Sequence, residues 1–283
     1  MAATLGETRT AQAAPPKKLK IKPVDAIPLW LRTLAAIVGV YFILPTFIVI
    51  PMGFGGATTT FKFPPEEFSV KLFENFFTNP AWIGSLGKSA LVGVLAALVA
   101  STFGTAAAVG LHFLPGRLPT LVRTLLMIPL VTPSIILAVS IYVSFLQWHL
   151  TGSLPGYVVA HAAIGLPYVL VSVTAALSSF DSTLLRASAS LGASPWRSFV
   201  TVTAPLISKG IGTGALFAFV TSFDEVVIAL YLRSPMFQTL PVQMYNSVTV
   251  EIDSTIAASS SLMVIIVSLI LFIPQFARAK KTS

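Results

Sequence analysis

Cysteine and charge are the two features that this sequence lacks most clearly. None of its 283 residues is cysteine, which excludes a disulfide framework, a thiolate metal site and a cysteine nucleophile. Only 10% of the residues are charged and 55% are hydrophobic, whereas about 25% of the residues in soluble domains are charged. The mean hydropathy is +0.85. This composition excludes an intrinsically disordered chain, argues against an ordinary soluble domain and indicates a membrane protein.

Motifs for chemistry on a substrate are also absent. The sequence contains no complete phosphate-binding loop (Gly, four residues, Gly-Lys-Ser/Thr) and no His-Glu-x-x-His pair. Its three histidines, His112, His149 and His161, fall at or near expected helix ends and lack the spacing of metal ligands. We therefore expect no catalytic residue, no metal site and no cofactor in this chain, and we expect that it is not an enzyme.

Four stretches of the sequence carry no charge, namely 33–61, 89–116, 124–180 and 254–277. A membrane-spanning helix needs about 20 mostly apolar residues. The third stretch is long enough for two such helices, and a polar run at 147–153 divides it. The segment 207–232 is a further candidate, although it contains Asp224 and Glu225. We therefore predict an all-α integral membrane protein with six spans, at about 29–52, 85–112, 121–146, 156–177, 207–232 and 256–276.

Basic residues indicate the side of the membrane on which each loop lies. In a six-span chain, fourteen of the eighteen Lys and Arg fall on one face and four on the other. Because Lys and Arg concentrate in cytoplasmic loops, both termini are predicted to be cytoplasmic. The net charge of +8 is then explained by topology better than by nucleic-acid binding. Residues 1–28 are predicted to be a disordered cytoplasmic arm, 29–278 the transmembrane domain and 279–283 a cytoplasmic tail.

The cytoplasmic loop 178–208 carries the signals of helix ends. Asp181 and Ser182 are good N-cap residues for a short helix that reaches Leu191. Gly192 follows at the place where a left-handed residue ends a helix. The loop therefore begins with a short helix and a tight turn.

A second short helix is expected after that turn. Ser194 is a good N-cap, and Pro195 occupies the first helical position, where its missing N–H costs nothing. Pro205 then closes the unit and leads into the fifth span. Because caps specify structure and not partners, these signals alone also fit an interfacial linker that joins two spans.

This loop resembles the cytoplasmic signature of binding-protein-dependent ABC importer permeases. The family pattern is Glu-Ala-Ala, three residues, Gly, nine residues and Ile-x-Leu-Pro. The glycine, the proline and their spacing fit, but Arg186 replaces the Glu and Ser188 replaces the second Ala, so the family's contact through Glu is changed here. The residues that the resemblance assigns to ATPase coupling are Arg186, Ala187, Ser188, Leu191, Gly192, Ala193, Ser194, Pro195 and Pro205.

A second resemblance concerns the fifth span and the segments that follow it. Residues 218–230 look like the spermidine/putrescine permease branch, in which a paired acid lies at the place of Asp224 and Glu225. Segments 239–245 and 254–258 are similar to the same branch. The branch also includes permeases for other small organic solutes, so an amino-acid derivative, an opine, a phosphonate or a metal chelate stays open as the solute.

The resemblance implies a type I ABC importer permease in a bacterial inner membrane. It implies as partners a second, similar permease in a heterodimer, two copies of an ATPase subunit and a periplasmic solute-binding protein. The ATPase would bind ATP and Mg²⁺ and hydrolyse the ATP, and the short helix before Gly192 would dock in a groove of the ATPase. A secondary transporter is the less favoured alternative, because no inverted repeat is evident.

A carboxylate inside a span costs at least about 2.5 kcal/mol, so Asp224 and Glu225 need an explanation. One of them, preferably Asp224, is expected to line the translocation path and attract a cationic solute. Alternatively, one pairs with a basic residue of the partner permease or serves helix packing. Tyr142 and Trp148 near the outer end of the third span are further pathway candidates, although an interfacial aromatic belt explains Trp148 as well.

Overall fold

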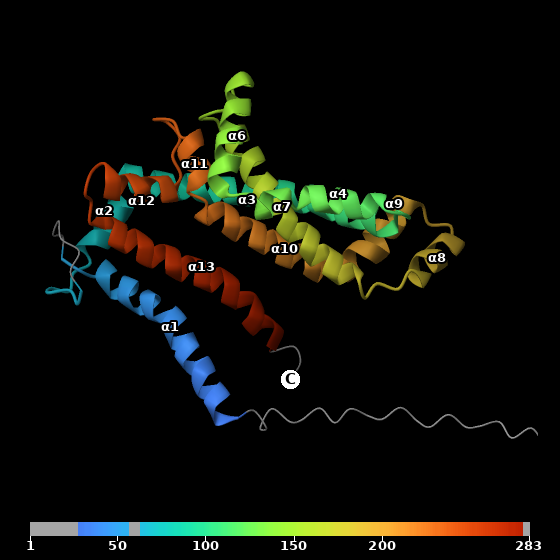
Figure 1. Cartoon of the computed structure of the whole chain (residues 1–283), viewed down its shortest axis with the longest axis horizontal. Coiled ribbons are helices and arrows are strands. Elements are labelled where there is room, and N and C mark those ends of the chain that lie inside the picture. Colours follow the sequence, from blue (N-terminus) through green and yellow to red (C-terminus); the bar gives the residue numbers. More distant parts are fainter. Residues whose placement is uncertain (1–27, 57–62, 280–283) are drawn as a thin grey trace, which may run out of the picture. The chain divides into compact units, whose positions relative to one another are not determined.

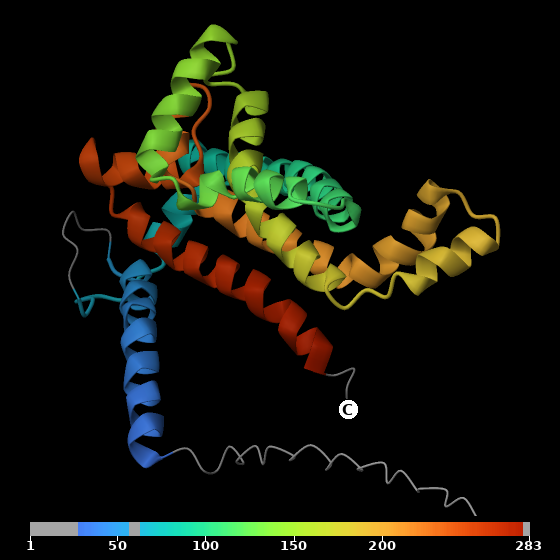
Figure 2. The same ribbon diagram turned by 45° about the vertical axis from the view of Figure 1, so that its right-hand side comes forward.

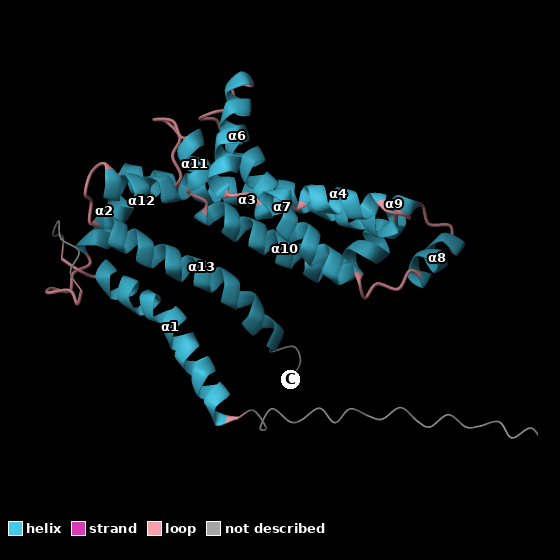
Figure 3. Cartoon of the chain, in the orientation of Figure 1, coloured by secondary structure: helices cyan, strands magenta, loops and turns pink. Residues whose placement is uncertain are grey.

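The computed structural model describes residues 28–56 and 63–279, without the side chains beyond Leu271. All the regular elements of these residues are helices, and two isolated β-bridges join loop residues (Figure 3). The chain divides into two units, residues 1–45 and residues 46–283. The predicted arm and tail lie almost entirely outside the described residues.

In chain order (Figure 1), the elements are α1 (Leu29–Gly53), α2 (Lys71–Thr78), α3 (Pro80–Phe113), α4 (Leu118–Leu126), α5 (Ile128–Val131), α6 (Ser134–Gln147), α7 (Leu154–Leu177), α8 (Thr183–Ser190), α9 (Pro195–Ser198), the π-helical turn η2 (Phe199–Thr203), α10 (Ala204–Asp224), α11 (Val227–Leu232), α12 (Leu240–Thr249) and α13 (Thr255–Ala279).

Four helices in the described part of the chain are long and apolar enough to cross a membrane. They are α1, α3, α7 and the continuous run from Pro195 to Asp224 formed by α9, η2 and α10. Shorter apolar helices are α6 and α13 as far as Leu271. The predicted all-helical fold is therefore confirmed for the described residues, and helices occupy each of the six predicted spans.

The third predicted span, 121–146, is not a single helix. It is divided into α4, α5 and α6, with breaks at Met127 and at Thr132–Pro133. Pro129 lies in the first turn of α5, and Pro133 is the N-cap of α6. Because proline has no N–H to donate to the preceding turn, each of these residues favours the start of a new helix over the continuation of the old one. The prediction was wrong here because it followed charge and not proline.

The fifth predicted span, 207–232, is likewise interrupted. Its main helix begins earlier and ends at Asp224, and the short helix α11 starts at Val227. Glu225 between them has the extended backbone angles φ −74° and ψ 114°. The two acids therefore lie at a helix end and not in the middle of a continuous helix.

Helices α3, α7 and α10 pack together and form the main core of residues 46–283. Val169 of α7 lies between two glycines: a Cβ added to Gly104 of α3 would be 2.8 Å from the Val169 Cβ, and one added to Gly214 of α10 would be 2.7 Å from its Cα. Small residues thus allow close helix approach, as in other membrane proteins. By contrast, a Cβ at Gly110 or Gly212 would meet no heavy atom within 4 Å.

The helices α8 and α9 lie at the opposite end of this unit from α2 and α12 (Figures 1 and 2). Sequence reading did not predict α2 or α12, which are short helices within the loops that follow the first and fifth spans. Leu72 and Phe76 are the buried residues of α2, one helical turn apart, so the helix covers the core with one face. These two helices position the polar cavity that is described next.

Candidate functional site

Gly192 ends α8 in the left-handed conformation that the sequence predicts, with φ +79°. Its N–H donates to the Ala189 carbonyl at 2.9 Å, and the Ala193 N–H donates to the Ser188 carbonyl at 3.1 Å. This pair of bonds is a Schellman motif, which satisfies the last carbonyls of a helix and requires a left-handed residue at the position of Gly192. Glycine is the residue that adopts this conformation without a steric cost.

The beginnings of α8 and α9 are also capped. Asp181 Oδ1 accepts a hydrogen bond from the Thr183 N–H at 2.9 Å, and Ser194 Oγ accepts one from the Arg197 N–H at 3.3 Å. Hydrogen bonds from the Thr183 side chain and backbone lower the pKa of Asp181. Ser182 occupies the N-cap position of α8 with helical backbone angles and makes no side-chain cap bond, so the prediction of a cap at Ser182 was wrong.

A hydrogen bond of 2.7 Å between the hydroxyls of Ser188 and Ser198 joins α8 to α9. The turn between the two helices leaves large apolar side chains in the open: Leu191 is 89% exposed and Trp196 is 73% exposed. Arg186 and Ala187 are exposed on α8 as well. An apolar surface on a rigid, capped turn is typical of a contact with another protein or with lipid.

Pro205 does not close the loop, contrary to the prediction. It lies in the first turn of α10, directly after the π-helical turn η2, and the helix runs on continuously from Pro195. Pro205 has no N–H to donate to a carbonyl of the preceding turn. The helix accommodates it because that turn, η2, has the wider π-helical geometry. The α8–α9 unit is thus joined to α10 by helix and not by a flexible segment.

Asp224 and Glu225 have different surroundings at the end of α10. The Asp224 side chain is exposed and makes no hydrogen bond or ion pair with any described residue. Glu225 is partly buried, and its Oε1 accepts a hydrogen bond from the Ile228 N–H at 2.9 Å. Glu225 therefore caps the first turn of α11, which leaves Asp224 as the acid with an available carboxylate.

His161 lies inside α7 and is 0% exposed, so the expectation that it lies near a helix end was wrong. Its Nδ1 is 3.1 Å from the Ser222 carbonyl oxygen and 2.8 Å from the Ser222 Oγ. Among the described residues its Nε2 has no partner. Because Ser222 comes two residues before Asp224, this contact fixes the end of α10 against α7. No sequence signal announced it, since the two residues are far apart along the chain.

Tyr142 and Trp148 do not share a site. Tyr142 is partly buried on α6, with its ring 6.0 Å from that of Tyr231 on α11, and it lines a cavity of about 460 Å³ together with Arg233. Trp148 is 64% exposed at the end of α6. The structure thus connects Tyr142, but not Trp148, with the segment that follows Glu225.

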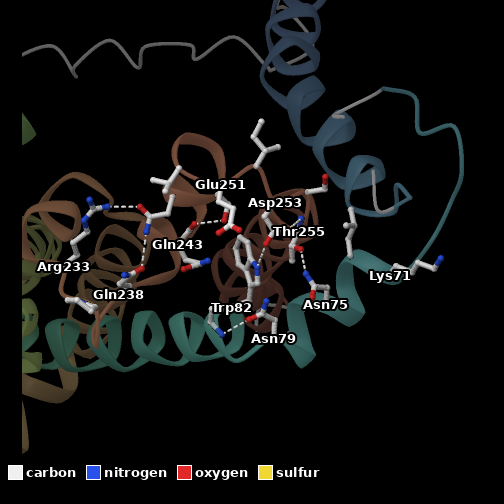
Figure 4. Close-up of a pocket in the computed structure, with 18 of the residues that line it drawn as sticks. Lys71, Asn75, Asn79, Trp82, Arg233, Gln238, Gln243, Glu251, Asp253 and Thr255 are labelled. Carbon is white, nitrogen blue, oxygen red and sulfur yellow. Dashed lines mark hydrogen bonds between the residues drawn. The ribbon is translucent and has the colours of Figure 1, made fainter. Parts of the chain in front are cut away.

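A polar cavity lies at the end of the unit that carries α2 and α12. It measures about 980 Å³ and is bounded by α2, the start of α3, the segments on both sides of α12, and α12 itself (Figure 4). Charged groups and amides supply most of its polar lining. These residues are Lys71, Asn75, Asn79, Arg233, Gln238, Gln243, Asn246, Glu251 and Asp253.

Asp253 is held in this cavity by neutral donors. The fully buried Trp82 donates its Nε1–H to Asp253 Oδ2 at 2.9 Å, and the Thr255 N–H donates to Oδ1 at 2.9 Å (Figure 4). Burial by itself raises the pKa of Asp253, but the hydrogen bonds from Thr255 and Trp82 outweigh it and lower the pKa below its ordinary value. The carboxylate is therefore ionised at neutral pH.

Side-chain amides hold the other polar groups of the cavity. Arg233 Nη1 donates to Asn246 Oδ1 at 2.8 Å, and Asn246 Nδ2 donates to Gln238 Oε1 at 3.2 Å. Asn75 Nδ2 donates to the Thr255 hydroxyl. A cavity of this size with fixed polar groups suits a small polar molecule. In the described residues, no three His, Asp or Glu side chains are grouped as metal ligands would be.

Comparison with known proteins identifies the class of protein. The family described as "Binding-protein-dependent transport system inner membrane component" matches residues 100–281. The spermidine/putrescine transport system permease protein PotC of Escherichia coli K12 is 24% identical over 86% of this chain and 91% of its own length. PotC of Haemophilus influenzae is 26% identical over 81% and 89%, and the putrescine transport system permease protein PotI of Escherichia coli K12 is 29% identical over 76% and 79%.

Two solved structures have a similar fold. A bacterial ABC transporter that imports the acidic polysaccharide alginate matches with a TM-score of 0.67 and 13% identity, over 88% of this chain and 94% of the other. The alginate transporter in complex with its periplasmic protein, which carries an alginate pentasaccharide, matches with a TM-score of 0.64 and 14% identity over the same shares. At this identity the likeness concerns the fold.

Proposed function

The chain belongs to the family of binding-protein-dependent transport system inner membrane components and is a permease subunit of an ABC importer, and we propose that it carries a polyamine or a similar small cationic solute. Similarity to three polyamine permeases along most of the chain is the observation that supports this solute class. The exposed Asp224 carboxylate at the end of α10 supports it too, because it can attract a cation.

For the topology we propose six spans with both termini in the cytoplasm of a bacterial inner membrane. The first, second, fourth and fifth spans contain α1, α3, α7 and α10, and the third and sixth contain α6 and α13. The asymmetric distribution of Lys and Arg supports this orientation. Residues 1–28 and 279–283 are then a cytoplasmic arm and tail, and 178–208 is a cytoplasmic loop.

For energy coupling we propose that α8 and α9 dock on a separate ATPase subunit, which hydrolyses ATP. The rigid Gly192 turn and the exposed Leu191 and Trp196 suit such a contact. Since α9 continues through η2 into α10, a displacement of the docked turn is transmitted directly to the helix that ends at Asp224. Rigid-body motion of this kind changes access to a site without ATP chemistry in the permease.

The proposed assembly consists of this permease, a second permease, two ATPase subunits and a periplasmic solute-binding protein. The structural relative that was solved together with a periplasmic protein supports the last of these partners. Asp224 is proposed to line the pathway between the two permeases, and Tyr142 to lie near its outer end. Trp148, exposed at the end of α6, is assigned to the membrane interface.

Co-purification and transport test the proposal together. An affinity-tagged chain should retain an ATPase subunit and a second permease, and proteoliposomes of this complex should accumulate putrescine only with ATP and the solute-binding protein. Asp224→Asn should lower uptake several-fold, because it removes a negative charge from the translocation path. The complex should still assemble, because the change breaks no contact among the described residues. Putrescine uptake by the chain alone, driven by an ion gradient, would instead identify a secondary transporter.

A further inference from the structure

We propose that the polar cavity between α2 and α12 is a solute-binding site of the permease itself, which holds a small molecule carrying an amino group on Asp253. This inference rests on the proposed function, since it names the solute class and the place at which the permease first binds it. The cavity is separate from the Asp224 position at the end of α10. One short helix, α11, leads from that position to Arg233, which lines the cavity.

The size of the cavity fits a small organic solute. Its volume of about 980 Å³ is at the upper end of the range of about 300–1,000 Å³ that is typical of small-molecule sites. It is bounded by two stretches that are distant in sequence, residues 71–82 and residues 233–255, so it forms only when both are packed together. A site that arises in this way has a fixed shape before the solute arrives.

The charges inside the cavity favour an ammonium group at its centre. Glu251 and Asp253 lie in the middle of the lining, between Arg233 on one side and Lys71 on the other (Figure 4). The Arg233 guanidinium already donates to the Asn246 amide, and Lys71 is exposed. Neither cation forms an ion pair with Asp253 within the described part of the chain, so the centre keeps its negative charge.

The way in which Asp253 is held points to a ligand. Its two oxygens accept hydrogen bonds from the Trp82 indole and the Thr255 backbone, which orient the carboxylate but do not neutralise it. Trp82 is fully buried and Thr255 is 1% exposed, so the two donors that orient the carboxylate are themselves held in place by packing. With no counter-ion for Asp253 among the residues that the structure describes, its oriented carboxylate can bind an ammonium group through charge-assisted hydrogen bonds.

Amide groups in the same cavity supply neutral contacts for the remainder of the solute. Gln238 and Gln243 come from the segment around α12, and Asn75 and Asn79 come from α2 and its end. An amide both donates and accepts hydrogen bonds, so it can serve an amine, a hydroxyl or an amide of the ligand. The amino group is therefore the recognised feature, and the rest of the molecule is less restricted.

Direct binding to the complete complex tests the site. The permease pair with its ATPases is placed in nanodiscs without the solute-binding protein, and binding of radiolabelled putrescine and spermidine is measured by equilibrium dialysis. Asp253→Asn keeps the shape of the side chain and the contact with Trp82. It should weaken binding about tenfold or more, because the neutral amide replaces the carboxylate that binds the ammonium group. Glu74→Gln is the matched control: Glu74 is an exposed acid of α2 outside the cavity, and its exchange should leave binding unchanged.

A second variant and competing solutes keep the test decisive. Glu251→Gln, on the exposed side of the same loop, should weaken binding by about two- to threefold, and it provides the test if Asp253→Asn does not assemble. Sorbitol and succinate should fail to displace putrescine. Displacement by either one at similar concentration would overturn the amino-group assignment.

The remaining outcomes separate the cavity from the proposed function. If the Asp253→Asn complex binds putrescine normally but no longer responds to the solute-binding protein in an ATPase assay, the cavity is a protein contact and the proposal is wrong. If an assembled wild-type complex binds neither polyamine, the proposal is also wrong, while the role as a permease stands. Failure of the ATPase and the second permease to co-purify would instead refute the proposed function.

Discussion

The two ends of the unit formed by residues 46–283 are held together by different kinds of contact. In the α8–α9 turn, each cap joins residues two to five positions apart, and the Ser188–Ser198 bond joins residues ten positions apart. In the cavity at the opposite end, the bond from Trp82 to Asp253 joins residues 171 positions apart. The α8–α9 turn is therefore specified by residues that are close in sequence, whereas the cavity forms only when segments that are distant in sequence pack together.

This difference determines how each end responds to change. A local turn forms wherever its caps are present, so it can protrude as an independent, rigid surface. The cavity depends on the packing of α2, α3, α12 and α13, so its shape reports on the rest of the fold. We infer that the first arrangement suits a coupling element and the second suits selective binding of a solute.

The largest effect is expected from a change at Gly192. Gly192→Val places a β-branched residue at φ +79°, where even unbranched residues are strained by about 1–2 kcal/mol. The end of α8 should then rearrange, and ATP-driven uptake should fall about tenfold or more. Uptake in proteoliposomes is compared at equal membrane levels of the protein.

The control for this change is Gly192→Asn, because asparagine tolerates the left-handed conformation better than other side chains do. It should retain most of the uptake. Normal uptake by Gly192→Val would contradict both the coupling role and the proposed docking of α8.

The second largest effect is expected from a substitution in α10, which lies between the α8–α9 turn and the cavity. Gly214→Val forces a side chain into the backbone of α7 at Val169, and overpacking of this kind costs about 1–3 kcal/mol. Thermal unfolding of the purified complex should occur at a lower temperature, and both ends should be affected. Gly212→Val, two residues away and facing open space, should unfold like the wild type; equal losses in the two variants would show that close packing is not the cause.

A smaller effect is expected from Trp82→Phe, which keeps an aromatic ring but removes the donor to Asp253. Because Asp253 is only partly buried and keeps the Thr255 donor, the loss should be smaller than the about 1–3 kcal/mol of a fully buried acceptor left without a partner. The loss should affect putrescine binding at the cavity and leave ATP-driven coupling at α8 intact, in contrast to Gly192→Val. Measuring binding and basal ATPase activity on the same sample distinguishes the two ends, and a parallel fall of both would contradict their independence.

The smallest effect concerns pH. The pKa of Asp253 is lowered in the folded chain, so its contribution to stability is complete above the unfolded value of about 3.9 and is lost as the pH falls through the folded value. The difference in unfolding temperature between wild type and Asp253→Asn should be constant from about pH 8 to about pH 5 and disappear only in stronger acid. A difference that already declines between pH 7 and pH 6 would show that another group is responsible.

Much of the α8–α9 turn could be predicted from the sequence, because its signals are local. Gly192, Ser194 and Pro195 each specify a helix end through their own backbone chemistry, and the structure has these ends at the predicted places. Prediction was less accurate where two local signals competed. At Pro133 the apolar run favoured one long helix, but the missing N–H of proline divided it.

The roles of the two acids at the end of α10 were not accessible from the sequence. Glu225 caps α11 and Asp224 is exposed, a division that depends on where the helix ends. His161 is similar: its buried contact with Ser222 requires α7 and α10 to be side by side. Such contacts have no periodic or local signature, so the sequence does not distinguish their members from other polar residues.

The sequence by itself determined that this chain is a helical membrane protein, the approximate places of its long apolar helices and the turn at Gly192. Hydrophobic length, charge distribution and helix caps act within about one span, so they can be read along the chain. Only the tertiary structure decided that Trp82, Asp253 and Arg233 share one cavity and that, of the two acids Asp224 and Glu225, Asp224 keeps an available carboxylate. These features arise from contacts between distant segments, whose positions are fixed by the packing of α3, α7 and α10.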